Sequence, residues 1–226
     1  MKTPDEMATF WDERAREDAL FYVDDRGLRG EDFWRGGQEA IDIFESELGF
    51  SAAGSFLVDV GCGVGRLTRV LAGRAQRMVA IDVSAEMLVL AREHNPGLDH
   101  VEWVLGDGLH LTGVPDGQAD GVFSHVVFQH VPDPAITLGY VTEMGRVLRP
   151  GGWAAFQIST DPAVHRRRWS LRRRPATGHA AWRGSAVDLG ALRETASAAG
   201  LTVEAVVGEG TQFCLIRLAA TPNVHY

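Results

Sequence analysis

Three glycines follow an apolar run in a pattern that suits a turn holding a ligand. The run 56–60 is followed by Gly61, Gly63 and Gly65, and Asp59 lies one residue before its end. So many glycines are costly in a regular element and are useful where the backbone needs positive φ or a ligand approaches closely. The pattern therefore predicts a strand, a tight turn and a helix, with an acid beside the turn.

Two further acids occur where later strands are expected to end. Asp82 ends the second apolar run, and Asp107 follows the third between Gly106 and Gly108. A carboxylate can accept from both ribose hydroxyls, and a second one can accept from an exocyclic amine. Each acid alone could be a helix cap or a turn residue. Because ligands bind at the carboxyl ends of parallel strands, the acids together favour a ligand with a ribose and a base.

The elements that must position these residues form a regular alternation. Strands are expected at 56–60, 78–82, 101–105, 121–124, 153–158, 202–207 and 212–218, and helices at 65–73, 84–94, 133–148 and 186–199. This alternation predicts an α/β fold, a doubly wound, mostly parallel sheet with helices on both faces. The hairpin-length link 208–211 makes the last strand antiparallel. Pro150-Gly151-Gly152 predicts a turn before the fifth strand.

The first 50 residues predict a helical cap or lid on a core formed by 51–226, all within one domain. Thr3, Pro4 and Glu6 form a capping-box pattern for a helix over 3–18, and a second helix is expected over 32–48. This stretch is rich in aromatic residues. They could serve plain packing or contact a ligand.

A nicotinamide dinucleotide is the natural competing ligand. Its fingerprint G-x-G-x-x-G requires a third glycine where this chain has Arg66. A G-x-G-x-G turn with a second acid after the third strand instead suits a ligand with ribose and adenine but no pyrophosphate. An oxidoreductase is therefore kept only as an alternative.

These residues resemble the class I S-adenosylmethionine (SAM) dependent methyltransferases. The run 59–65 is similar to the first motif of that family, Asp82 with Ser84 and Met87 to its ribose-binding acid and following helix, and Gly106-Asp107 to its adenine-side acid. The segments 123–131 and 148–152 resemble those after the fourth strand and before the fifth. The resemblance implies a seven-stranded sheet, an antiparallel last strand and SAM as the cofactor.

The resemblance also implies roles for individual residues. Asp59 would face the ammonium group of SAM, Asp82 the ribose, Asp107 and Gly108 the adenine edge, while Ser124 would form the floor under the sulfonium. The full set of expected cofactor-binding residues is Asp59, Gly61, Cys62, Gly63, Gly65, Asp82, Val83, Met87, Asp107, Gly108 and Ser124.

Methyl transfer from an activated sulfonium depends mainly on alignment of the acceptor, so a general base is optional. His130 is the candidate catalytic base and His125 the second, with a structural role for either equally open. Aromatic side chains of the cap could shield the sulfonium through cation–π contact. The candidates for this contact are Trp11, Tyr22 and Trp34.

Composition narrows the location and the partners. The net charge of −8 argues against nucleic acid or an anionic membrane, and no membrane span or targeting segment is evident, so we expect a soluble, cytoplasmic protein. The two cysteines, Cys62 and Cys214, predict neither a disulfide framework nor a metal site.

The acceptor is expected to be a small organic molecule. The chain has Ser124-His125-Val126-Val127 where nucleic-acid amino-methylating members of the family carry an acid or amide followed by two prolines. An irregular stretch, 159–185, is expected to be a substrate-side insertion, and it holds six arginines in the nine residues 166–174. This run could be a solvated loop, a lid for an anionic acceptor or a docking patch for an acidic partner. A SAM-using cyclase and a non-catalytic SAM-binding regulator remain alternatives.

Overall fold

The computed structural model describes residues 3–24, 26–165 and 184–222. The arginine-rich run 166–174 and most of the expected insertion lie outside the described residues. The helices are α1 Pro4–Val23, α2 Gly30–Leu48, α3 Arg66–Ala72, α4 Ala85–His94, α5 Pro134–Val147, α6 Pro162–His165 and α7 Leu189–Ala198, with a 3-10 turn η1 Phe128–His130. The strands are β1 Phe56–Val60, β2 Arg77–Asp82, β3 Val101–Leu105, β4 Ala119–Ser124, β5 Leu148–Ile158, β6 Leu201–Val207 and β7 Cys214–Ala220.

All seven strands form one sheet in the order β3-β2-β1-β4-β5-β7-β6. The first five pair in parallel, and β7 pairs antiparallel with both β5 and β6. The expected fold class is therefore confirmed. The strand order reverses between β1 and β4, which is where a doubly wound sheet opens a crevice for a ligand.

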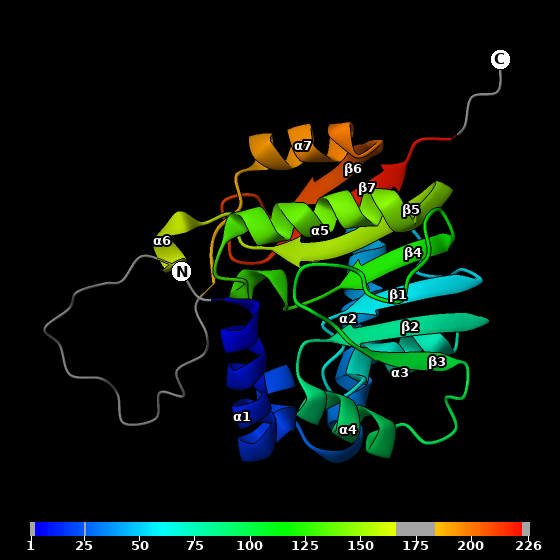
Figure 1. Ribbon diagram of the computed structural model, residues 1–226, viewed down its shortest axis with the longest axis vertical. Helices are drawn as coiled ribbons and strands as arrows, with labels where there is room; N and C mark the ends of the chain where they lie inside the picture. Colours follow the sequence, from blue (N-terminus) through cyan, green and yellow to red (C-terminus); the bar gives the residue numbers. More distant parts are fainter. Residues whose placement is uncertain (1–2, 25, 166–183, 223–226) are drawn as a thin grey trace, which may run out of the picture.

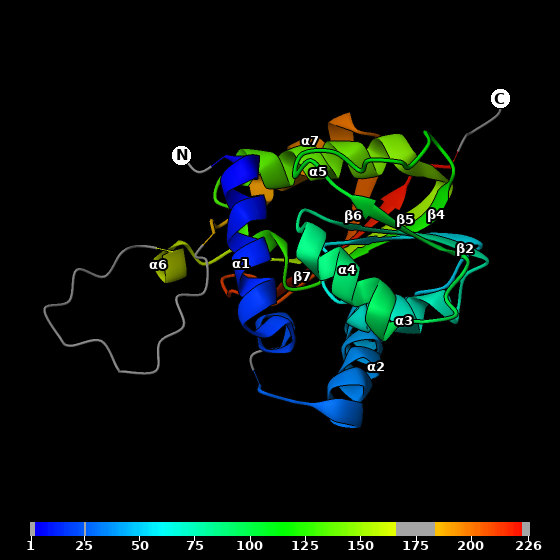
Figure 2. The ribbon, with the colours of Figure 1, turned by 60° about the horizontal axis from the view of Figure 1, so that its bottom comes forward.

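Helices cover both faces of the sheet. In Figure 2, α5 and α7 lie over one face, while α2, α3 and α4 lie over the other. Each face has its own apolar core. Val141 and Met144 of α5 pack in the first, and Ile41 and Phe44 of α2 in the second, all of them at most 1% exposed.

The first helix, α1, stands across the carboxyl ends of the parallel strands, whereas α2 packs on a face of the sheet. The arrowheads of β4 and β5 point to the side of the molecule on which α1 lies (Figure 1).

The capping box is present, because the Thr3 hydroxyl accepts from the Glu6 amide at 3.3 Å and the Glu6 carboxylate accepts from the Thr3 amide at 2.9 Å. The first helix is longer than expected and runs to Val23. It breaks at Asp18, whose carboxylate accepts from the Phe21 amide at 3.2 Å and so caps the next turn.

One prediction about β5 is wrong. Pro150-Gly151-Gly152 lies inside the strand rather than in a turn before it. The pairing with β4 shifts there, from Ala119 opposite Leu148 to Gly121 opposite Trp153, and Gly151 has φ 77°. The extra residues form a bulge, which the sequence pattern does not distinguish from a turn.

Candidate functional site

The glycine turn between β1 and α3 brings the backbone close to the loop that follows β4. Gly61 has φ 72°, and a Cβ built there would lie 2.3 Å from Cγ2 of Val127. Gly65 has φ 81°, and its Cβ would lie 2.6 Å from Nδ2 of Asn95, so it lets the start of α3 pack against the end of α4. Only glycine fits either position. Gly61 therefore lets the turn approach the loop after β4, whereas Gly65 serves helix packing.

Two buried carboxylates flank this turn. Asp59, 1% exposed, accepts from the Thr68 hydroxyl at 2.6 Å, and burial raises the pKa of its carboxyl to about 7. Asp82, 9% exposed, accepts from the amides of Gly63 at 2.8 Å and Ser84 at 2.9 Å. Burial raises the pKa of Asp82 too, and those two amides oppose the rise. The turn thus has two acceptors whose charge the protein only partly compensates.

Both carboxylates line a cavity, here called the inner cavity, which encloses about 120 Å³ of free space. Of the expected cofactor-binding residues, the following line it: Asp59, Gly61, Cys62, Gly63, Asp82, Val83, Met87 and Gly108. Sequence reasoning missed ten other lining residues, among them Met7, Arg66, Val127 and Tyr140. The cavity fits a ligand that presents a cation, hydroxyls and a flat ring, because buried acids and glycine backbone stand beside apolar walls.

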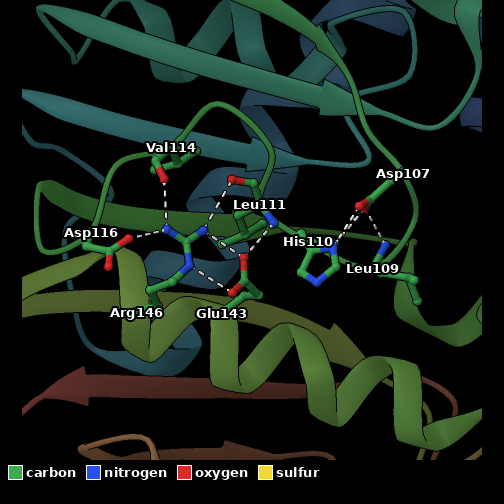
Figure 3. Close-up of polar contacts among 8 residues, drawn as sticks. All are labelled: Asp107, Leu109, His110, Leu111, Val114, Asp116, Glu143 and Arg146. Carbon is green, nitrogen blue, oxygen red and sulfur yellow. Dashed lines mark hydrogen bonds and ion pairs between the residues drawn. The ribbon is translucent and has the colours of Figure 1, made fainter.

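Three expected residues do not line the inner cavity. Gly65 is one of them, as described above. Ser124 is fully buried, and its hydroxyl donates to the Val60 carbonyl at 2.9 Å, tying β4 to β1. The carboxylate of Asp107 bonds to the His110 ring at 2.7 Å and accepts from the amides of Leu109 and His110 at 2.8 Å each (Figure 3). Its carboxylate serves the loop that follows β3.

That loop is held in place by Arg146 of α5 (Figure 3). The guanidinium bonds to Glu143 at 2.7 Å, to Asp116 at 2.6 Å and to the Val114 carbonyl at 3.0 Å. Glu143 in turn accepts from the Leu111 amide at 3.0 Å. The carboxylates of Glu143 and Asp116 raise the pKa of Arg146. These bonds tie the loop after β3 to α5, and the i, i+3 spacing of Glu143 and Arg146 is their sequence signal.

The first helix covers the inner cavity and is anchored to α4. Asp12 accepts from the Ser84 hydroxyl at 2.6 Å, and Arg16 pairs with Glu86 at 2.6 Å. Trp11 and Tyr22, two of the three aromatic residues expected to shield the sulfonium, line the cavity. Trp34 lies elsewhere: the Arg69 guanidinium stands 3.6 Å from its ring centroid, and it lines neither cavity described here.

A second cavity, here called the outer cavity, adjoins the inner one and has a volume of about 680 Å³. It opens between α1, α2, the loop after β4 and the hairpin that joins β6 to β7. Arg66 lines both cavities and pairs with Asp24 at 2.9 Å. The residue that departs from the dinucleotide fingerprint thus ties the end of α1 to the start of α3.

The loop after β4 forms the wall between the two cavities and carries a strained residue. Val126 has φ 59°, which is rare for a β-branched side chain. Its amide donates at 3.2 Å to Gln157, which itself donates to Gln129 at 2.7 Å. Strained backbone that is held in this way is typical of functional sites.

Two histidines line this shared wall. The Nε2 atom of His130 lies 3.1 Å from the side-chain amide nitrogen of Gln129, and its ring packs edge-on against Trp11. His125 packs edge-on against Phe44, and burial lowers the pKa of its imidazole to about 4. His125 is therefore neutral at physiological pH. Because the Gln129 amide donates to Nε2 of His130, that lone pair is engaged.

Residues 58–156 match the family model described as a methyltransferase domain. The solved complex of DhpI with S-adenosylhomocysteine (SAH) has the same fold, with a TM-score of 0.63, 25% identity and 98% of both chains covered. This chain carries a class I SAM-dependent methyltransferase domain. The cofactor of the methyltransferase domain is SAM.

Relatives of the methyltransferase domain act on different molecules. Trans-aconitate 2-methyltransferase of Azoarcus sp. (strain BH72) is 40% identical over 114 residues, which are 49% of this chain and 42% of the relative. A ubiquinone biosynthesis O-methyltransferase of Thiobacillus denitrificans is 34% identical over 105 residues, 46% of this chain and 44% of the relative. The chain thus matches less than half of the length of either.

Structures with lower identity share the fold alone. The N-methyltransferase NodS of Bradyrhizobium japonicum, solved with SAH, has a TM-score of 0.60 at 21% identity and covers 90% of this chain and 99% of its own. A separate search for membrane-spanning helices covered the residues that the structure describes. Among them, none of the helices combines the length and the apolar character that crossing a bilayer requires.

Proposed function

We propose that this protein transfers the methyl group of SAM to a small organic acceptor and that residues 1–226 act as one catalytic domain. The observation that carries the proposal is the pair of buried carboxylates, Asp59 and Asp82, beside a glycine turn in a cavity that shares lining residues with a second, larger one. The inner cavity would hold the cofactor and the outer cavity the acceptor.

The cofactor would be held by residues that already line the inner cavity. Asp59 would accept from the ammonium group, and Asp82 from the ribose hydroxyls. The backbone at Gly61 and Gly63 would pass beside the methionine part, and Met87 would pack against the adenine. The predicted role of Asp107 at the adenine edge requires its carboxylate to leave His110.

Bound SAM supplies a methyl group that is already activated by the positive sulfur. The protein's share is to align an acceptor and to exclude water, and alignment can contribute as much as ~7–11 kcal/mol. The α1 helix supports this role because Trp11 and Tyr22 close the side of the cavity away from the sheet. His130 would act as a base only after its Nε2 parts from Gln129.

The test is binding of SAH by calorimetry, followed by turnover on a panel of small acceptors. Asp82→Ala is expected to weaken SAH binding by roughly 10- to 150-fold, because a lost hydrogen bond to a charged group costs ~1.5–3 kcal/mol. Asp120→Ala is the matched control, since Asp120 also accepts a backbone amide, that of Phe56 at 2.7 Å, but lines neither cavity.

An affinity for SAH that stays within about twofold in Asp82→Ala would refute the ribose assignment. Product analysis separates the alternatives: SAH indicates methyl transfer, and methylthioadenosine indicates cyclisation. Tight SAM binding without either product on the whole panel would favour a regulator.

A further inference from the structure

The outer cavity shares part of its wall with the inner one. Residues of α1, Arg66 at the start of α3 and the loop after β4 line both cavities, among them Trp11, His125 and His130. An occupant of the outer cavity would therefore touch the same side chains as an occupant of the inner one. Its volume of about 680 Å³ is in the range of small-molecule sites.

The walls of the outer cavity are rich in aromatic rings from separate elements. Trp11, Phe21 and Tyr22 come from α1, Phe44 from α2 and Phe213 from the β6–β7 hairpin. Phe213 is 60% exposed, so an apolar ring stands at the solvent side of the cavity. Aromatic side chains pack well against flat rings in offset or edge-to-face geometry. The shape of the wall therefore favours a ring-bearing occupant.

The charged groups in this wall are already matched to one another. Asp24 pairs with Arg66 at 2.9 Å and with Arg26 at 2.6 Å. Arg26 also lies 3.7 Å from Glu39. These two cations and two anions are the charged residues that line the outer cavity among the described residues. A charged occupant would have to break one of these pairs, so an uncharged one fits better.

One polar side chain in the shared wall lacks a protein partner. Neither ring nitrogen of His125 makes a hydrogen bond to the residues that the structure describes, and its Nδ1 atom is buried. Nearby, Gln157 bonds to Gln129, to the Val126 amide and to the Gln212 carbonyl. Arg66 pairs with Asp24 through one terminal nitrogen, while its Nε atom has no partner. Because Nδ1 has almost no accessible surface, Nε2 is the ring nitrogen that an occupant of the outer cavity can reach, and a hydrogen bond there would give the ring a partner.

We infer that the outer cavity binds an uncharged aromatic hydroxy compound as the methyl acceptor, with its hydroxyl hydrogen-bonded to the imidazole of His125. The inference rests on the proposed function, because it takes the inner cavity as the cofactor site. A hydroxyl both donates and accepts, so it can bond to the neutral imidazole in either tautomer. Trp11 and Phe44 would enclose the ring.

The experiment measures binding of three matched coumarins to the protein loaded with SAH, at pH 6.5. They are 7-hydroxycoumarin, 7-methylcoumarin and 7-carboxycoumarin, which differ only in the group presented to the wall. We expect 7-hydroxycoumarin to bind at least tenfold more tightly than the other two. SAH binding is measured first, since its absence would refute the proposed function rather than this inference.

Three variants test whether the hydroxyl of 7-hydroxycoumarin bonds to His125. His125→Leu should weaken 7-hydroxycoumarin about tenfold, to the level of 7-methylcoumarin, and leave 7-methylcoumarin within twofold. His125→Gln, which keeps a polar atom near Nε2, should restore most of the difference. Phe213 lines the outer cavity but not the inner one. Phe213→Ala should therefore weaken the binding of all three coumarins without changing SAH affinity more than twofold.

Three results would overturn the inference. The first is that no coumarin binds to the SAH-loaded protein. The second is that 7-carboxycoumarin binds best, which would indicate an anionic acceptor. The third is that His125→Leu, folded by its circular dichroism, weakens the hydroxy and methyl compounds equally.

Discussion

The strongest prediction concerns Asp59, because its burial should make the stability of the ligand-free protein depend on pH. Burial raises the pKa of Asp59 from 3.8 to about 7. Between these values the folded protein keeps a proton that the unfolded chain has lost. The free energy of unfolding therefore falls as pH rises through this window.

The size of the effect follows from the same numbers. At about 1.4 kcal/mol per pH unit, the full window corresponds to about 4 kcal/mol, and the part between pH 5 and pH 8 to about 3 kcal/mol. Asp59→Asn has no proton to lose and keeps an oxygen that can accept from Thr68. The free energy of unfolding of the variant minus that of the parent should thus grow by about 3 kcal/mol from pH 5 to pH 8.

The measurement is urea unfolding of both proteins at pH 5, 6, 7 and 8. Titrating groups that do not interact with Asp59, such as His125, cancel in the difference. Asp120→Asn is the control: Arg149 and the Phe56 amide hold the pKa of Asp120 below 3.8, so its difference from the parent should stay flat over this range. A difference for Asp59→Asn that changes by less than about 1 kcal/mol would refute the reasoning.

Two further predictions test the geometry around the site. Gly61→Ala should destabilise the protein by about 2–3 kcal/mol in urea unfolding, because the new Cβ meets both a left-handed backbone and Val127, whereas Gly97→Ala, with φ 85° and nothing within 4 Å, should cost only about 1 kcal/mol. Equal losses in the two variants would contradict the close approach at Gly61. Arg146→Ala should lower the free energy of unfolding by about 1.5–3 kcal/mol and speed hydrogen exchange at the Leu111 amide. The control is Arg149→Ala, because the Arg149 guanidinium pairs with Asp120 and its loss should leave that exchange unchanged. Unchanged exchange in Arg146→Ala would show that the clamp does not hold the loop.

Much of the fold was predictable because local signals agreed with the periodicity. Ser84 and Asp133 cap α4 and α5 as their sequence positions indicate, and β1 and β3 have the expected bounds. The bulge in β5 was not predictable, because Pro-Gly-Gly has the same composition in a turn and in a bulge. The extension of α1 past Asp18 depends on a side-chain cap that the helical pattern alone does not reveal.

The sequence by itself determined which strand ends contribute to the inner cavity. Glycines after β1 and an acid at the end of β2 come from neighbouring parallel strands, and topology brings such strand ends together wherever the fold forms. Only the tertiary structure decided that Asp107 faces His110 rather than the inner cavity, and that Trp34 packs on Arg69. Asp107 contacts His110 within one turn, and residue types alone do not tell whether that contact or a ligand holds the carboxylate. The contact of Trp34 with Arg69 joins residues far apart in the chain, which spacing does not encode. The same holds for the outer cavity, whose walls come from α1, α2, the loop after β4 and the last hairpin.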